Sequence, residues 1–368
     1  MRDVRFATLL KGKIKMTKFI DIHVLQNMPA NSINHDDAGQ QKTVVYGGSL
    51  RQRVSSQAWK RAVRQKFQEE PQDYLAGHRT KHIVKLVADE ILKNDTSLSL
   101  TDAQDKAKEA VKAGIGSKFE SGKGKNEYDT KTLLMLSNSQ IEKLAKFLVD
   151  NDDIDFKSKD VKTALKQIFT HDNSLDLSLF GRMVAEDESL NVDASSQVAH
   201  AFSVNEVVPE SDYFTAVDDD SEDNQGAAML DYTSYMTSVL YRYANLNVDD
   251  LKHNLGNDEL AEQGIKLFIK DFIMSMPTGK QNSFANVVLP NYIMIQVRDD
   301  MPVNLASAFE KSIRSKDGYL DKAIERLQSE NEKVQLLLDK PVKTAIINLN
   351  DDKSMSLSDA IDSVVSAL

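Results

Sequence analysis

The order of hydrophobic periodicities along the chain constrains its fold more than any other feature. Residues 18–26, "KFIDIHVLQ", alternate apolar and polar side chains, which is typical of a half-buried strand. From about residue 73 to 172 the periodicity is helical instead. Short β-like runs return after Leu175, at 239–248, 291–297 and 344–349. Early and late strands separated by about 100 helical residues predict an α+β sheet domain with an inserted helical domain.

Helical periodicity predicts the remaining elements. Within the insertion we expect helices near 78–94, 101–113, 132–150 and 157–170. Outside it we expect helices at 55–68, 305–316 and 356–368. The segment 204–235 has apolar flanks around a strongly acidic middle, and connections of this length are usually functional or disordered. We interpret it as a projecting hairpin or arm.

Composition excludes several classes of protein. The chain has no cysteine, so disulfides and thiolate metal sites are excluded, and a reducing cytoplasm fits best. No apolar run approaches the roughly 18 residues that a membrane span needs. A formal net charge of −10 argues against indiscriminate nucleic-acid binding. Because Met16 directly precedes the first strand, we expect residues 1–15 to be an extension upstream of the natural start.

One basic segment contrasts with this acidic chain. Residues 38–68 contain seven Lys or Arg and no Asp or Glu. In the predicted helix, which Ser55 or Ser56 would cap, Trp59, Ala62, Val63 and Phe67 form an apolar face. The opposite face carries Gln57, Lys60, Arg61 and Arg64.

Basic residues near a helix N-terminus are unfavourable by ~0.3–1 kcal/mol each unless an anion binds there. Helix N-termini bind phosphate well, and Gly47 with Gly48 would allow a ligand to approach the backbone closely. Two interpretations stay open from the pattern alone. The helix is either a solvated amphipathic helix or an anion site, for which a phosphate backbone is the natural ligand.

Other candidate sites carry weaker signals. The loop "NHDD", residues 34–37, suits an Asx turn better than a metal site. Tyr213 and Phe214 could form an exposed stacking platform, but neighbours on a strand point in opposite directions, so we expect at least one in the core. No catalytic motif is present, and we expect neither a cofactor nor a bound metal.

Several motifs occur in an order that resembles one known family. They are "FIDIHVLQ", "NHDD", "RVSSQAWKRAVR", "LFGRMVA", "DYFTAVDD", "YRYANLNVDDLKHNLG", "MPTGKQNSFA" and "MPVNLASAFEKSI". Together they resemble the CasC family, the repeated backbone subunit of the type I-E CRISPR surveillance complex, Cascade. The resemblance runs from about Met16 to Leu320 and is weak through the helical insertion.

The resemblance implies a hand-like fold and an assembly. It implies an RRM-like (ferredoxin-type) palm of residues 16–66, 176–202 and 236–368, helical fingers at 67–175 and a β-hairpin thumb at 203–235. Copies would stack in a helical filament along a CRISPR RNA, and each thumb would kink the RNA of a neighbour and displace a base. The exposed segments would pair with target DNA in antiviral defence. Partners would include the large, small, RNA-end-capping and RNA-processing subunits of Cascade.

The resemblance also implies site residues. Contacts with the RNA backbone would come from Ser55, Ser56, Gln57, Lys60, Arg61 and Arg64. Further contacts would come from Lys42, Lys280 and Gln281. Met183 would pack beside the displaced nucleotide, and Tyr213 with Phe214 would form the wedge of the thumb, with Tyr213 at a position where Trp occurs elsewhere. His35 stands where the family commonly has Arg, which is a departure from the family pattern.

Two other functions remain open beside this non-catalytic scaffold. One is a metal-dependent nuclease that cuts target RNA with Asp36 or Asp37, as a loop Asp does in the related type III backbone subunits. The other is a lone RNA-binding regulator, which would bind RNA as a monomer.

Overall fold

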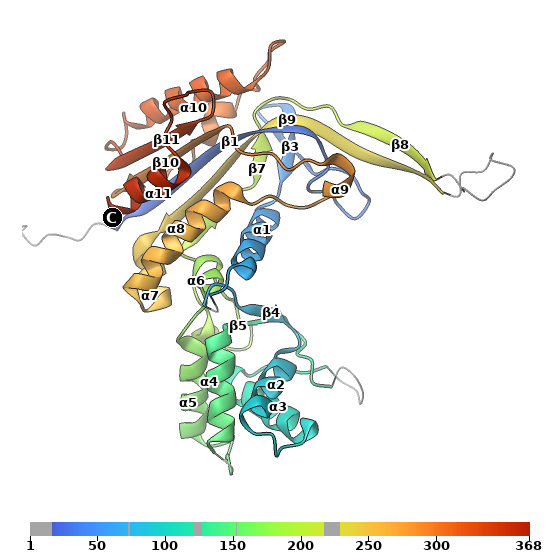
Figure 1. The fold of residues 1–368 in the computed structure, drawn as a ribbon, viewed down its shortest axis with the longest axis vertical. Coiled ribbons are helices and arrows are strands. Elements are labelled where there is room, and N and C mark those ends of the chain that lie inside the picture. The colour runs from blue at the N-terminus through green and yellow to red at the C-terminus, as the bar shows by residue number, and fades with distance from the viewer. Residues whose placement is uncertain (1–16, 73, 121–126, 152, 217–228) are drawn as a thin grey trace, which may run out of the picture.

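The computed structural model describes residues 17–72, 74–120, 127–151, 153–216 and 229–368. These residues form a large sheet with helices on both faces, a helical part to one side of it, and a projecting two-stranded arm (Figure 1). The predicted N-terminal extension and the acidic run at 218–223 lie outside the described residues. Among the described residues, no helix combines the length and hydrophobicity of a membrane span.

The sheet is mostly antiparallel, with the strand order β11-β10-β1-β9-β7-β3-β2. These strands are β1 (Phe19–Asn31), β2 (Thr43–Tyr46), β3 (Ser49–Val54), β7 (Ala201–Ser203), β9 (Met229–Asn247), β10 (Tyr292–Arg298) and β11 (Lys343–Asn348). Two more strands, β6 (Ser196–Val198) and β8 (Glu210–Ala216), also pair with β9. The four strands predicted from alternation are therefore present as β1, β9, β10 and β11.

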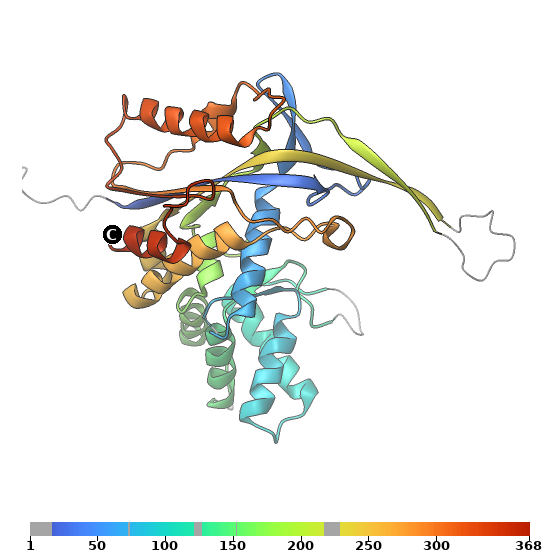
Figure 2. The same ribbon diagram turned by 45° about the horizontal axis from the view of Figure 1, so that its top comes forward.

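Helices cover both faces of the sheet (Figure 2). One face packs on α1 (Ser56–Glu69), α6 (Leu175–Phe180), α7 (Val248–Leu255), α8 (Asp258–Met274) and α11 (Leu357–Val365). The other face packs on α10 (Leu320–Val334) and the 3₁₀ helix η2 (Leu305–Phe309). The prediction of a half-buried first strand is therefore wrong, because Asp21 and His23 on its polar side are fully buried.

The helical insertion has a hydrophobic core of its own. We call it the helical part; it contains β4 (His78–Thr80), α2 (Ile83–Asn94), α3 (Leu100–Ile115), β5 (Leu134–Leu136), α4 (Asn138–Val149) and α5 (Lys159–Thr170). Two predicted helices begin later than expected because β4 and β5 pair with each other. The shorter helices η1 (Glu188–Leu190) and α9 (Gln281–Phe284) complete the described elements.

The predicted helix at 305–316 is mostly wrong. Only η2 is helical, because the chain then turns back towards the sheet. There the backbone N–H of Ile313 donates to the carbonyl of Val204 over 2.9 Å, and Ile313 forms a bridge with Asn205.

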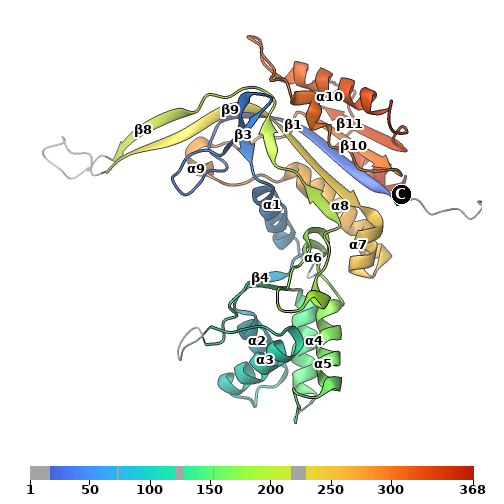
Figure 3. The ribbon, with the colours of Figure 1, turned by 180° about the vertical axis from the view of Figure 1, so that it is seen from behind.

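The arm consists of β8 and the first half of β9. Their register runs from Glu210 opposite Tyr235 to Ala216 opposite Met229. The two strands leave the body of the sheet as a ribbon, in agreement with the projecting hairpin predicted for this segment (Figures 1 and 3).

Arg242 of β9 holds α1 against the sheet. Its guanidinium carbon lies 3.8 Å from the ring centroid of Trp59 in α1 and 4.9 Å from that of Phe272 in α8. Its N–H groups donate to the side chain of Gln26 and to the carbonyls of Phe272 and Ile273. Burial lowers the pKa of Arg242 to about 9. The apolar face of α1 is thus fixed by a buried cation as well as by packing.

A buried polar network lies on the opposite face of the sheet. The hydroxyl of Tyr243 donates to Oδ1 of Asp21 over 2.6 Å, and Nδ1 of His23 lies 3.0 Å from the hydroxyl of Tyr241. Burial raises the pKa of Asp21 to about 7, although hydrogen bonds and the charge of Arg298 oppose this shift. Burial lowers the pKa of His23 to about 3. Both side chains are therefore favoured in their neutral forms.

This network predicts that Asp21 makes stability depend on pH. The unfolded chain releases the Asp21 proton near pH 3.8, whereas the folded protein keeps it until about pH 7. The folded state binds more protons in this window, so the free energy of unfolding falls as the pH rises through it. Asp21→Asn should remove this dependence, worth ~1.4 kcal/mol per unit of pKa shift.

Urea unfolding at pH 4.5 and pH 7.5 measures the effect. The wild-type protein should lose stability relative to Asp21→Asn between the two pH values, while Asp317→Asn, a change at an exposed site, should show a constant difference. If the free energies of unfolding of the wild type and Asp21→Asn differ by the same amount at pH 4.5 and pH 7.5, the prediction is wrong.

Candidate nucleic-acid interface

The helix α1 forms as the sequence predicts. The side chain of Ser55 caps it by accepting from the backbone N–H of Ala58 over 3.4 Å. The backbone N–H of Ser55 donates to Oδ1 of Asn34 over 2.9 Å, which fixes the start of the helix on the loop after β1. Its buried side chains are Trp59, Ala62, Val63 and Phe67, so the predicted apolar face is confirmed.

Two of the three cations on the opposite face of α1 have no acidic partner among the described residues. These are Lys60 and Arg61, whereas Arg64 pairs with Asp176. Burial lowers the pKa of Lys60, whose Nζ lies 5.7 Å from the ring centroid of Phe180. Partial burial of an unpaired ammonium is costly, and an anion bound beside it would offset that cost.

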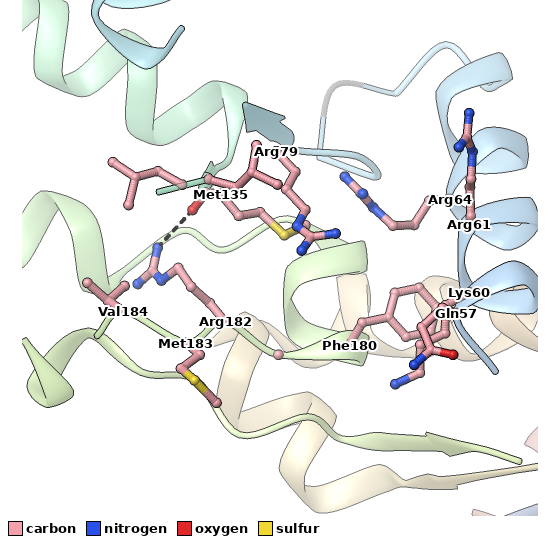
Figure 4. A pocket seen from close by; sticks show the side chains of 13 residues that line it. Gln57, Lys60, Arg61, Arg64, Arg79, Met135, Phe180, Arg182, Met183 and Val184 are labelled. Atoms are coloured by element: carbon pink, nitrogen blue, oxygen red, sulfur yellow. Dashed lines mark hydrogen bonds between the residues drawn. The ribbon is translucent and has the colours of Figure 1, made fainter. Parts of the chain in front are cut away.

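This face forms one wall of a cavity of about 610 Å³, the α1 cavity (Figure 4). The polar lining residues are Gln57, Lys60, Arg61, Arg64, Arg79 and Arg182. The others are Leu133, Leu134, Met135, Phe180, Gly181, Met183 and Val184. Figure 4 shows the side chains of α1 facing Arg79 and Met135 of the helical part and the loop that carries Met183. The cavity therefore combines a cationic wall on α1 with a mostly apolar facing wall to which Arg79 adds one more cation.

The loop with Met183 is anchored by its neighbour Arg182. This buried guanidinium donates to the carbonyls of Leu190, Met135 and Phe169, and burial lowers its pKa to about 10. The side chain of Met183 is 85% exposed, which is unusual for a large apolar residue. A tethered loop thus presents a free thioether at the cavity.

A second hollow of about 430 Å³ lies at the N-terminal end of α1. It shares Gln57 and Arg61 with the α1 cavity, so the two adjoin along the helix. Its far side is the segment 277–279, which packs tightly on the loop after β1, since a Cβ atom at Gly279 would lie 2.5 Å from the carbonyl oxygen of Ile33. The predicted contacts Lys280 and Gln281 follow directly in the chain, and Lys280 is exposed.

Other predicted residues lie elsewhere. Lys42 does not line either hollow but lies near Arg53 and His200. A terminal nitrogen of Arg53 is 3.1 Å from Nδ1 of His200. Burial and the charges of Arg53 and Lys42 lower the pKa of His200. Arg64 does line the α1 cavity, but its Nε pairs with the buried carboxylate of Asp176 over 2.8 Å.

The aromatic pair lies on β8 of the arm and lines neither of the two hollows beside α1. Tyr213 is 51% exposed and Phe214 is 38% exposed, so the expectation that at least one belongs to the core is wrong. The physical reason is that, among the described strands, β8 pairs only with β9, so the described part of the arm is a two-stranded ribbon. The ring of Tyr213 is 5.2 Å from that of Tyr232 on the neighbouring strand, which forms an exposed aromatic surface.

Two further interpretations of the basic segment need correction. Arg51 is fully buried and donates to the carbonyls of Ser203 and Val204, each over 2.8 Å, so its charge is not at the surface. A Cβ atom at Gly47 would lie 1.6 Å from the carbonyl oxygen of Glu310, so the close approach at this glycine is to the protein's own backbone.

The loop "NHDD" forms an Asx turn. Oδ1 of Asp36 accepts from the backbone N–H groups of Ala38 and Gln40, over 3.0 Å and 2.9 Å. Within the part of the chain that the structure describes, no group of three or more acidic or histidine side chains is arranged to hold a metal ion.

Sequence reasoning missed Arg79, Phe180, Leu133 and Met135 at the α1 cavity. Three of them come from the helical part, and only the fold brings that part beside α1. Phe180 alone had a local signal, because it lies within the motif "LFGRMVA".

Known proteins resemble the chain over nearly its whole length. A chain of a solved structure described as "CRISPR RNA-guided surveillance complex, pre-nicking" is 30% identical, with a TM-score of 0.83 over 95% of this chain and 100% of that one. A second, from a "CRISPR RNA-guided surveillance complex", is 28% identical, with a TM-score of 0.72 over 95% and 100%. No curated protein matches. The family model described as CT1975-like protein matches residues 20–366, and the chain therefore belongs to this family of Cas proteins.

Proposed function

We propose that the chain is a non-catalytic backbone subunit of a type I-E Cascade complex, which binds CRISPR RNA and oligomerises along it. The observation that carries this proposal is the α1 cavity, where Lys60 and Arg61 line a space into which the facing wall exposes Leu133 and Met183. The solved relatives are chains of CRISPR RNA-guided surveillance complexes, which supports the same role.

The chemistry of the cavity suits an RNA backbone. Lys60, Arg61 and Gln57 would contact phosphates and sugars, which carry no sequence information. A subunit that must accept any guide requires such contacts, and sequence specificity then passes to base pairing. The apolar wall around Met183 and Phe180 would accommodate a base displaced from the stack.

The arm supports oligomerisation along the RNA. Its exposed Tyr213 and Phe214 project away from the sheet, and stacking a base on an aromatic ring is worth ~1–3 kcal/mol. We therefore assign the arm as the thumb, which reaches over the RNA held by a neighbouring copy. The sheet with its helices would be the RRM-like palm, and the helical part the fingers. Other Cascade subunits and the target DNA would be further partners.

The proposal predicts a salt-dependent effect of the basic face. Replacing Lys60 and Arg61 by Ala should weaken binding to single-stranded RNA. It should also reduce the slope of log K against log salt concentration by about 0.7 for each phosphate that the variant no longer neutralises. Fluorescence anisotropy over a series of salt concentrations measures both quantities.

Lys66→Ala is the matched control, because Lys66 lies on the same helix but pairs with Glu69 over 2.7 Å and does not line the cavity. It should leave the slope unchanged. An unchanged slope in the double variant, with an intact circular dichroism spectrum, would remove the α1 face from the RNA site.

The proposal also predicts that the chain does not cut RNA. The carboxylate of Asp36 is occupied by its own turn, which argues against the nuclease alternative. Complementary RNA incubated with the RNA-loaded protein and Mg²⁺ should remain intact on a denaturing gel. Cleavage that disappears in Asp36→Ala or Asp37→Ala would contradict the proposal.

A further inference from the structure

The chain passes between the sheet and the helical part twice, and one buried carboxylate joins both crossings. Oδ1 of Asp176 accepts from the backbone N–H of Gly77 over 2.9 Å and from Oγ of Ser174 over 2.6 Å. The backbone N–H of Asp176 donates to the carbonyl of Leu75 over 3.1 Å. The two segments are therefore bonded to each other just where they enter and leave the helical part.

Arg64 of α1 is bonded to the same junction. Its Nε donates to Oδ2 of Asp176 over 2.8 Å, and one of its terminal nitrogens donates to the carbonyl of Gly77 over 3.3 Å. Gly77 thus donates to Asp176 and accepts from Arg64, which closes a ring of three residues. A Cβ atom at Gly77 would lie 2.7 Å from the carbonyl oxygen of Leu136, so the ring lies tightly against β5.

This ring lies between the two walls of the α1 cavity. Arg64 belongs to the cationic wall on α1. Gly77 directly precedes β4, which carries Arg79 of the facing wall, and β4 pairs with β5, which carries Met135. The walls belong to parts of the protein with separate hydrophobic cores. A bond between them at their junction sets how far apart they stand.

We infer that Arg64, Asp176 and Gly77 form a clamp that fixes the width of the α1 cavity, and that Arg64 is a positioning residue. This inference rests on the proposed function, since it assumes that the cavity binds RNA. The side chain of Asp176 is fully buried. If Arg64 moved away to contact a phosphate, the Asp176 carboxylate would remain buried without a compensating charge, which is costly. Arg64 therefore contributes to RNA binding by holding the two walls of the cavity at a fixed distance.

A cavity of fixed width binds RNA more tightly, because the conformational entropy of ordering its two walls is lost on folding and not on binding. If the clamp is loosened, the RNA must order the two walls itself, so its affinity falls. The number of phosphates that the protein neutralises stays the same, and therefore so does the salt slope. Removal of a residue that binds a phosphate lowers both the affinity and the salt slope. The salt slope therefore shows whether Arg64 positions the walls or binds a phosphate.

The test uses Asp176→Asn in the full chain, with single-stranded RNA of guide length. The amide can still accept from Gly77 and Ser174 but no longer holds a charge against Arg64. Affinity should fall about fivefold or more, the lower end of typical coupling effects, with an unchanged salt slope. Hydrogen exchange should become faster in residues 74–77. Equal or higher affinity with a steeper slope would overturn the inference, because the released Arg64 would then be neutralising a phosphate.

Asp172→Asn is the matched control, because Asp172 lies near the same crossing but pairs with Lys143 at the exposed surface over 2.5 Å. It should change neither affinity nor exchange. The double variant Arg64→Ala with Asp176→Asn leaves no buried charge unpaired, so it keeps the test decisive if the single variant folds poorly. Its slope should equal that of the wild type, and a slope lower by about 0.7 would make Arg64 a phosphate ligand.

The RNA-binding proposal has its own control. Lys60→Ala with Arg61→Ala should lower the salt slope without faster exchange at 74–77. If this variant leaves the slope unchanged, the proposed function fails. If it behaves as expected while Asp176→Asn has no effect, only the clamp fails.

Discussion

The buried contact between Arg242 and Trp59 decides how α1 lies in this protein. A cation on the central strand β9 stacks on the one tryptophan and donates to carbonyls at the end of α8. The helix, the sheet and α8 therefore share one fixed point. That contact faces the sheet, and the opposite side of α1, with Lys60 and Arg61, faces the helical part across the α1 cavity. The packing of α1 on the sheet thus sets the position of the candidate RNA site on the other side of this helix.

The charges of the basic segment divide between structure and function. Arg51 is internal and bonded to carbonyls, Arg64 belongs to the clamp, and Lys66 pairs with a glutamate in its own helix. Only Lys60 and Arg61 are cations of α1 in the cavity without an acidic partner among the described residues. The density of positive charge in the sequence therefore overstates the charge offered to a ligand. A confined site of this kind is compatible with an acidic protein.

The sequence is informative where the signal is local. Alternation predicts β1, and helical periodicity with a capping serine predicts α1 and its two faces. Contacts between distant segments carry no such signal. The burial of Asp21 on the sheet face that packs on α10 and η2, the exposure of Phe214 on the arm, and the position of Arg79 opposite α1 all depend on the tertiary arrangement. The two glycines at 47–48 form a hairpin turn between β2 and β3, which is a local reason for glycine at both positions, and only Gly47 packs against another segment.

The most direct test of the central claim is a crosslinking map. RNA that carries 4-thiouridine and is long enough for several copies would be loaded with a mixture of isotopically labelled and unlabelled protein, irradiated and digested. We expect crosslinks to peptides spanning 55–64 and 180–184 of one copy, and to residues 210–216 of a differently labelled copy on the same RNA. Crosslinks confined to the α10 face, or arms that always crosslink within their own copy, would contradict an RNA-binding backbone subunit built around α1.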